Sequence, residues 1–226
     1  MDGSEAVMNL TIKNSKGEKR ERKIAMVTKL FDGGKTEKRV YRFLEPADVK
    51  GTGVLSFDYE SKSDDMWIYL PALRKTRRIV TSEKAKSFMG SEFSYADMNT
   101  PTLSDYTFRT LKEEQVDGVG CWKIEALPKN DGVADDEGYS KKYVWIAKNE
   151  FTIRKAEYFD LDGALLKVLI SKDVVVVDQA KGRYRSKYME MTNKQNGRQS
   201  IFKIEKIENV PNTSDSYFTT GYLERP

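Results

Sequence analysis

Strand-like segments follow one another along almost the whole chain, and this pattern restricts the fold more than any other feature. In each segment apolar residues, many of them β-branched or aromatic, alternate with polar residues or run continuously. Side chains on a strand point to opposite faces with a period of two, so such segments predict β-strands. We expect strands at Val7–Lys13, Arg20–Phe31, Glu37–Glu45, Gly53–Tyr59, Met66–Leu70, Tyr106–Leu111, Val119–Leu127, Tyr139–Ala147, Thr152–Phe159, Ala164–Ser171, Val174–Gln179, Arg185–Thr192 and Arg198–Ile207.

Short turn signals separate these segments. Glycine, asparagine and aspartate reach positive φ at low cost, so they favour tight turns between antiparallel neighbours. The signals are Asn14–Gly17, Asp32–Gly34, Pro46–Gly51, Asp117–Gly118, Asp131–Gly132, Asp162–Gly163 and Asn196–Gly197. The sequence therefore predicts an antiparallel, mainly β protein. Such a chain must form a barrel or a sandwich to bury its apolar faces.

Two segments interrupt the alternation. Thr81–Asn99 lacks a period of two and mixes lysine, alanine and aromatic residues around Gly90, which predicts a short helix or an ordered loop. Ser214–Arg225 is expected to form a final helical turn or an extended tail. No linker, repeat or shift in composition divides the chain, so we expect a single domain over residues 1–226.

The composition excludes several kinds of site. The chain has no histidine, which removes the commonest general base and the usual zinc and iron ligand sets. Its single cysteine, Cys121, cannot form an internal disulfide or a metal cluster, and beside Trp122 it is best explained as a buried small residue. Carboxylate pairs such as Asp64–Asp65 lie in polar turns where nothing would desolvate them. We therefore expect no enzymatic activity, metal or cofactor.

The charge pattern does not favour nucleic acid. The formal net charge is +4 and the basic residues are spread along the strands. The run Arg74–Arg78 fits a solvated strand face and also fits a contact with an anionic lipid or acidic partner. No apolar run approaches the about 20 residues of a membrane span, and the first seven residues do not form a signal peptide.

The strands carry more large apolar side chains than a sheet with only one buried face would need. Leu55 and Phe57 share one face of their strand, and Met66–Leu70 is apolar on both faces, with Trp67 and Tyr69 on one of them. A strand buried on both sides needs a second layer or a bound apolar molecule to cover it. Core packing and a ligand cavity both explain this pattern, and alternation alone does not separate them.

Seven runs of sequence, taken together and in order, carry a resemblance to a known family. They are RFLEPADVKGTGVL (42–55), MWIYLPALRKTRRI (66–79), SFMGSEFSYADM (87–98), CWKIEALP (121–128), YVWI (143–146), RKAEYFDLDGALLKV (154–168) and YFTTGYLER (217–225). The chain resembles the bacterial outer-membrane lipoprotein-sorting proteins, which are related in fold to the periplasmic lipoprotein carriers LolA and LolB. The resemblance extends over nearly the whole chain.

The resemblance implies an incomplete, half-open antiparallel β-barrel of the LolA/LolB type, with short helical or loop segments as a lid over an apolar cavity. It implies a carrier in the periplasm of a diderm bacterium that takes the acyl chains of lipoproteins or other lipids toward the outer membrane, with an inner-membrane exporter and an outer-membrane receptor as partners. An envelope sensor or protein-interaction module with the same fold is the alternative. Carriers of this type have a helix ahead of the first strand, whereas this chain begins almost at that strand, so the helix is either trimmed or absent. We also expect that a signal peptide or lipid anchor has been removed upstream.

Strand alternation and the resemblance together suggest a set of ligand-binding residues. Because the chain begins close to its first strand, the lid role falls to Thr81–Asn99. We hypothesise that a lipid-binding cavity is lined by Leu55, Phe57, Trp67, Tyr69, Trp122 and Ile124, and that its lid carries Phe88, Met89 and Phe93.

Overall fold

Thirteen strands within residues 3–225, the part of the chain that the computed structural model describes, form one antiparallel sheet. The strands are β1 (Gly3–Lys13), β2 (Lys19–Phe31), β3 (Thr36–Glu45), β4 (Gly53–Tyr59), β5 (Asp65–Leu70), β6 (Lys75–Arg78), β7 (Tyr106–Val116), β8 (Val119–Pro128), β9 (Lys141–Ala147), β10 (Ile153–Phe159), β11 (Leu165–Asp178), β12 (Arg183–Asn193) and β13 (Gln199–Asn209). Among the same residues there are two short α-helices, α1 (Asp131–Glu137) and α2 (Thr220–Leu223), and several three-residue 3-10 helices. The predicted mainly β fold is confirmed.

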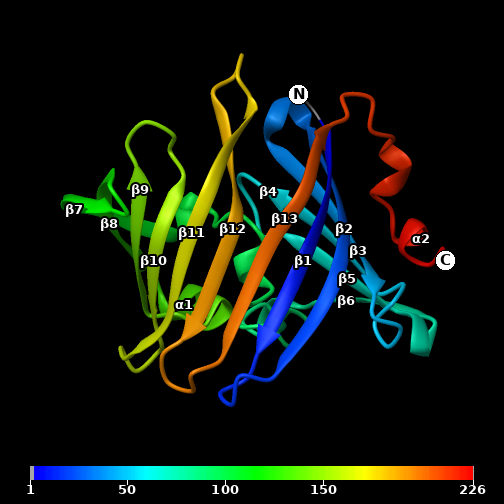
Figure 1. Cartoon of the computed structure of the whole chain (residues 1–226), viewed down its shortest axis with the longest axis horizontal. Coiled ribbons are helices and arrows are strands. Elements are labelled where there is room, and N and C mark those ends of the chain that lie inside the picture. Colours follow the sequence, from blue (N-terminus) through cyan, green and yellow to red (C-terminus); the bar gives the residue numbers. More distant parts are fainter. Residues whose placement is uncertain (1–2, 226) are drawn as a thin grey trace.

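The sheet is curved but does not close on itself within the described residues. Its strand order is β6-β5-β4-β3-β2-β1-β13-β12-β11-β10-β9-β8-β7, so β6 and β7 are the two edges. β1 and β13, from opposite ends of the chain, pair in the middle of the sheet. Figure 1 shows the sheet bending so that β4–β6 lie behind β1 and β13. The expected incomplete antiparallel barrel is confirmed.

Residues 79–105, here called the crossover segment, join the two edge strands. The segment lies against the concave face of the sheet, because Ile79, Phe88, Phe93 and Tyr95 belong to the same buried cluster as side chains from the strands. One row of that cluster crosses four paired strands through Ile68, Val54, Tyr41 and Met26. The core therefore lies between the concave face and the crossover segment.

The single domain expected over residues 1–226 stays a prediction, and residues 1, 2 and 226 lie outside the described part.

Phe88 anchors the crossover segment. Its side chain is fully buried, and its ring lies 5.6–6.2 Å, centroid to centroid, from the rings of Tyr41, Phe43, Tyr95 and Phe202. Burying a phenylalanine side chain contributes about 1.5–3 kcal/mol. Around this anchor the backbone forms single 3-10 turns at Thr81–Glu83, Phe88–Gly90, Ala96–Met98 and Leu103–Asp105. Of the two predictions for Thr81–Asn99, the ordered loop is correct.

The convex face of β2–β5 is covered by the C-terminal segment, residues 213–225. Phe218 and Leu223 from this segment pack with Val40 and Leu55 of the sheet. Arg42 on β3 holds α2 in place by donating hydrogen bonds to the carbonyls of Tyr222 and Leu223, both at 2.8 Å. The expected final helical turn is α2, which lies outside the sheet at the right of Figure 1.

Three local predictions were wrong. Asp131–Gly132 begins α1 and does not form a hairpin turn, because the Asn130 side chain caps the helix by accepting a hydrogen bond from the Val133 N–H at 3.0 Å. As a result β9 starts at Lys141, two residues after the predicted start. The two strands expected on either side of Asp173 form one strand, β11, since Asp173 takes up a positive φ of 53° without ending it.

Candidate functional site

An inner cavity of about 440 Å³ lies between the concave face of the sheet and the crossover segment. Its volume falls within the about 300–1,000 Å³ of small-molecule sites. Residues 96–101 of the crossover segment form one wall. The apolar part of the lining includes Met8, Met26, Tyr41, Phe93, Met98, Val144, Ile153, Leu169, Met189, Phe202 and Ile204. Methionine adapts its packing easily, so a lining with four methionines suits a ligand of variable shape.

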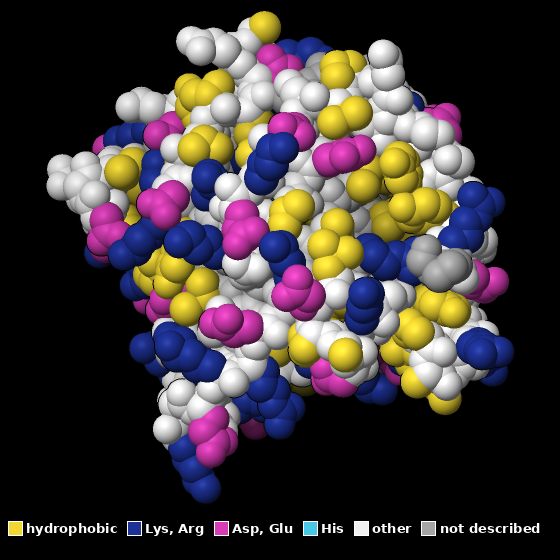
Figure 2. All heavy atoms as spheres, turned by 45° about the vertical axis from the view of Figure 1, so that its right-hand side comes forward, with side chains coloured by type: hydrophobic (Ala, Val, Ile, Leu, Met, Phe, Trp, Pro, Cys, Tyr) yellow, Lys and Arg dark blue, Asp and Glu magenta, His cyan; other side chains and the backbone are white. Residues whose placement is uncertain are grey.

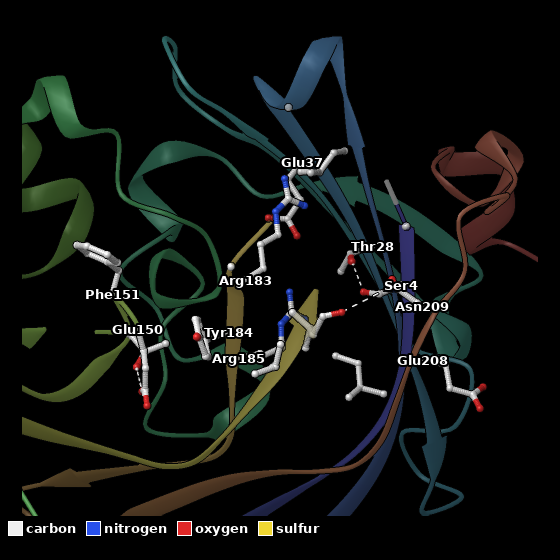
Figure 3. Close-up of a pocket in the computed structure, with 18 residues that line it drawn as sticks. Ser4, Thr28, Glu37, Glu150, Phe151, Arg183, Tyr184, Arg185, Glu208 and Asn209 are labelled. Atoms are coloured by element: carbon white, nitrogen blue, oxygen red, sulfur yellow. Dashed lines mark hydrogen bonds between the residues drawn. The ribbon is translucent and has the colours of Figure 1, made fainter. Parts of the chain in front are cut away.

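An outer chamber of about 540 Å³ adjoins the inner cavity, and Thr152, Tyr184 and Arg185 line both. Ser4 and Thr28, whose hydroxyls are 2.7 Å apart, form one wall. The turn between β9 and β10 and the hairpin of β11 and β12 form the other (Figure 3). This chamber is more polar than the inner cavity, so a ligand that extends through both would meet a polar wall at one end and an apolar wall at the other.

Arg39 on β3 ties the crossover segment to the sheet at one end of the inner cavity. Its guanidinium pairs with Glu37 at 2.5 Å and Asp58 at 3.1 Å, and donates to the Met98 carbonyl at 2.7 Å. Burial alone would lower the pKa of Arg39, but Glu37 and Asp58 outweigh it and raise the pKa above its ordinary value. Burial likewise opposes ionisation of Glu37, but Arg39 holds the pKa of that carboxyl below its usual range. Arg39 and Glu37 therefore form a fixed ion pair.

Lys142 on β9 occupies a second polar position in the cavity wall. Its ammonium donates to Glu137 at 2.7 Å and to the Tyr106 hydroxyl at 3.2 Å. Burial alone would lower the pKa of Lys142, but Glu137 and Tyr106 raise it above 10.5. Burial raises the pKa of Tyr106 to about 12. Near it, Asp97 accepts from the Tyr139 hydroxyl at 3.0 Å. Lys142 is therefore held in its protonated form between Glu137 and Tyr106.

Four of the six side chains expected to line a cavity lie together on the convex face. Leu55, Phe57, Trp67 and Tyr69 belong to the cluster that the C-terminal segment covers, and the rings of Phe57 and Trp67 are 5.1 Å apart. Alternation identified the two faces of β4 and β5 correctly but does not show which face is concave. Both faces are apolar because the crossover segment covers one and the C-terminal segment the other.

The other expected residues lie on the concave side. Trp122 and Ile124 on β8 share a face with Val144, which lines the inner cavity, but they themselves lie outside the lining of both chambers. Of the expected lid residues, Phe93 lines the inner cavity and Met89 packs on the core that contains Phe88. A role in ligand binding stays a prediction for each of these residues. Met8 and Met26 were not expected, although both occupy alternating apolar positions on long strands.

The basic run at β6 is neutralised locally. Arg77 pairs with Glu83 at 2.6 Å, and Arg78 pairs with Asp65. Figure 2 shows lysine and arginine side chains interspersed with aspartate and glutamate over the face that it presents. These pairings favour the solvated strand face over a contact with an anionic partner. Within residues 3–225, no cluster of three or more potential metal-ligand side chains is present.

Comparison with solved structures identifies the family. A domain from Vibrio parahaemolyticus that is named for outer membrane lipoprotein sorting is 30% identical in sequence, with a TM-score of 0.90 over 99% of this chain and 92% of that one. The chain belongs to the outer-membrane lipoprotein-sorting protein family. This lipoprotein-sorting family member is equally similar to a DUF1329 family protein from Desulfovibrio piger. The two are 30% identical in sequence, with a TM-score of 0.90 over 98% of this chain and 91% of that one.

A solved structure of lower sequence identity supports the fold of this lipoprotein-sorting family member. A LolA superfamily protein from Nitrosomonas europaea is 19% identical, with a TM-score of 0.70 over 98% of this chain and 91% of that one. A family model described as that of an uncharacterized protein matches residues 35–225. No curated protein matches the sequence. Among the described residues, no helix has the length and apolar character needed to cross a membrane.

Proposed function

We propose that this protein is a periplasmic carrier that binds the acyl chains of lipoproteins or other lipids in its inner cavity. The observation that carries the proposal is the cavity itself, which has a methionine-rich apolar lining and adjoins a more polar chamber. Each methylene group removed from water contributes about 0.8 kcal/mol, so even part of an acyl chain would gain substantial binding energy there. The membership in a family named for lipoprotein sorting supports the same function.

The crossover segment is the cover of the cavity in this proposal. It consists of irregular backbone with single helical turns, whereas the opposite wall is a continuous sheet. Phe88 anchors it in the core, and Arg39 binds its Met98 carbonyl. Residues 96–101 line the cavity, so opening it would require the hydrogen bond from Arg39 to the Met98 carbonyl to break while Phe88 stays in place. In this proposal the lid role expected for residues 81–99 belongs to their C-terminal part.

The proposed role is binding without catalysis. The charged groups at Arg39 and Lys142 are held in ion pairs, and Lys142 stays protonated at neutral pH, so it is neither a base nor a nucleophile. The carrier would receive lipid at the inner membrane and pass it to an acceptor at the outer membrane. An inner-membrane exporter and an outer-membrane receptor are the partners that this route requires.

Titration with an environment-sensitive fluorescent acyl probe tests the function. The parent protein is expected to bind the probe saturably with one site. Met26→Trp, which adds bulk to the cavity wall, should weaken binding by at least about tenfold, equivalent to about 1.4 kcal/mol. Leu103→Trp changes an exposed residue of the crossover segment and should bind as the parent does. Absence of saturable binding by the parent would contradict the proposal and favour the envelope sensor or protein-interaction module.

A further inference from the structure

Five charged side chains line the inner cavity, and one of them differs from the rest. Arg39 pairs with carboxylates, Lys142 pairs with Glu137, and Asp97 accepts hydrogen bonds from neighbouring groups. The fifth, Arg185, makes no hydrogen bond or ion pair through its guanidinium with any residue in the described part of the chain. A guanidinium has five N–H donors in a planar fork, which suit a carboxylate or phosphate.

Arg185 lies at the junction of the two chambers. It is half-buried on β12 and lines both the outer chamber and the inner cavity. Figure 3 shows it on the same strand as Arg183, whose side chain extends toward Glu37. A lipid whose tail fills the apolar inner cavity would place its polar end at this junction.

The acidic groups around the junction already have partners. Glu37 binds Arg39 at 2.5 Å, and the positive charges of Arg183 and Arg185 further lower its pKa. Glu150, on the opposite side of the outer chamber, pairs with Arg154. Neither carboxylate is bonded to Arg185, so the donors of Arg185 remain available to a ligand.

Two hydroxyl groups lie in the same wall. Ser171 on β11 and Ser186 on β12 line the inner cavity, and their oxygens are 2.5 Å apart. Ser186 follows Arg185 directly in the chain. Ser171 and Ser186 therefore add two hydroxyls to the cavity lining that Arg185 shares, and a hydroxyl is a possible hydrogen-bond donor to an oxyanion.

We propose that Arg185 binds the anionic headgroup of a single-chain lipid, a carboxylate or phosphate, whose tail lies in the inner cavity. This assignment rests on the proposed carrier function, because it requires an acyl chain in that cavity. The assignment also specifies the class of ligand. A lipid with an anionic headgroup is bound more tightly than a neutral lipid whose acyl chain has the same length.

Competition against the neutral acyl probe tests the assignment with three ligands of equal chain length. These are hexadecanoate, palmitoyl lysophosphatidylglycerol and the neutral monopalmitoylglycerol. For the parent protein, at least one anionic ligand should compete at least about tenfold better than the neutral one. The stronger of the two anions distinguishes a fatty-acid carboxylate from a phospholipid phosphate.

Variants at position 185 separate charge from packing. Arg185→Gln should lower the affinity for the better anion by at least about tenfold more than it lowers the affinity for monopalmitoylglycerol, whereas Arg185→Lys should keep part of the preference for the anion. Arg20→Gln removes an exposed charge from β2 and serves as the matched control. Equal affinity of the parent for all three ligands, or an unchanged preference in Arg185→Gln, would overturn the headgroup assignment and leave the carrier function standing. Failure of the probe itself to bind would instead reject the carrier function.

Discussion

The guanidinium of Arg39 on β3 donates a hydrogen bond of 2.7 Å to the main-chain carbonyl of Met98 in the crossover segment. This contact joins the rigid wall of the inner cavity to its irregular cover. The same guanidinium neutralises Glu37 and Asp58, so the side chain has both an electrostatic and a positioning role. The consequences of breaking this contact can be measured directly.

Replacement of Arg39 is expected to loosen the cover and destabilise the protein. Arg39→Met leaves the buried carboxylate of Asp58 and the half-buried carboxylate of Glu37 without their cation, which should lower the free energy of unfolding by about 3–5 kcal/mol. Hydrogen exchange at residues 96–101 should become faster. Lys172→Met, which removes an ion pair with Asp117 in which both side chains are exposed, should cost about 1 kcal/mol or less. Equal costs in urea unfolding for the two variants would contradict the role given to Arg39.

Phe88 is expected to be the main apolar anchor of the crossover segment. Phe88→Ala removes a fully buried ring that contacts four others, and should lower the free energy of unfolding by about 3–5 kcal/mol. Phe151→Ala truncates a ring that is 75% exposed and should change stability by about 0.5 kcal/mol or less. Chemical denaturation of both variants checks this. A small effect of Phe88→Ala would show that the segment is held by its polar contacts instead.

Stability is expected to fall in acid partly through Glu137. Burial opposes its ionisation, but Lys142 and Tyr106 hold the folded-state pKa below the ordinary 4.5. A lowered pKa contributes stability that is present above about pH 4.5 and is lost as the pH falls through the folded-state value. Glu137→Gln should therefore destabilise the protein at pH 7 and reduce the loss of stability below pH 4.5.

Urea midpoints measured between pH 3 and pH 7 test this expectation. Glu18→Gln is the matched control, since Glu18 lies in an exposed turn between β1 and β2. A Glu137→Gln variant with the same pH profile as the control would show that the pair with Lys142 does not contribute.

Trp67 distinguishes the convex face from the cavity. The sequence-based hypothesis placed it in the cavity lining, whereas the structure packs it beside Phe57 beneath the C-terminal segment. Trp67→Ala is therefore expected to lower stability by about 3 kcal/mol and to change acyl-probe affinity by about twofold or less. A loss of binding without a loss of stability would restore Trp67 to the ligand site.

The sequence predicts the local elements well because alternation is a local property. Segments such as Gly53–Tyr59 were placed at the observed positions, since period and turn residues determine them together. The pairing of β1 with β13 depends on contacts between distant parts of the chain, which alternation does not specify, and it was not predicted. The start of α1 was missed because its cap, Asn130, resembles a turn residue in sequence.

The ligand site was less predictable than the fold. Alternation places Leu55 and Val54 on opposite faces of β4. It cannot show that the C-terminal segment covers the face with Leu55 and that the crossover segment covers the face with Val54. Arg185 carries no sequence signal of its own. Arg185 is a candidate ligand-binding residue because it lies at the junction of the two chambers, and this junction exists only in the assembled sheet.

Photo-crosslinking with a palmitoyl chain that carries a diazirine near its end, followed by peptide mapping, is the most direct measurement of where a lipid binds. We expect labelling on β1, β2, β11 and β12, at or beside Met8, Met26, Leu169 and Met189, and loss of that labelling when unlabelled lipid is in excess. Labelling confined to the convex face around Phe57 and Trp67, or labelling that excess lipid does not reduce, would contradict an acyl chain in the inner cavity.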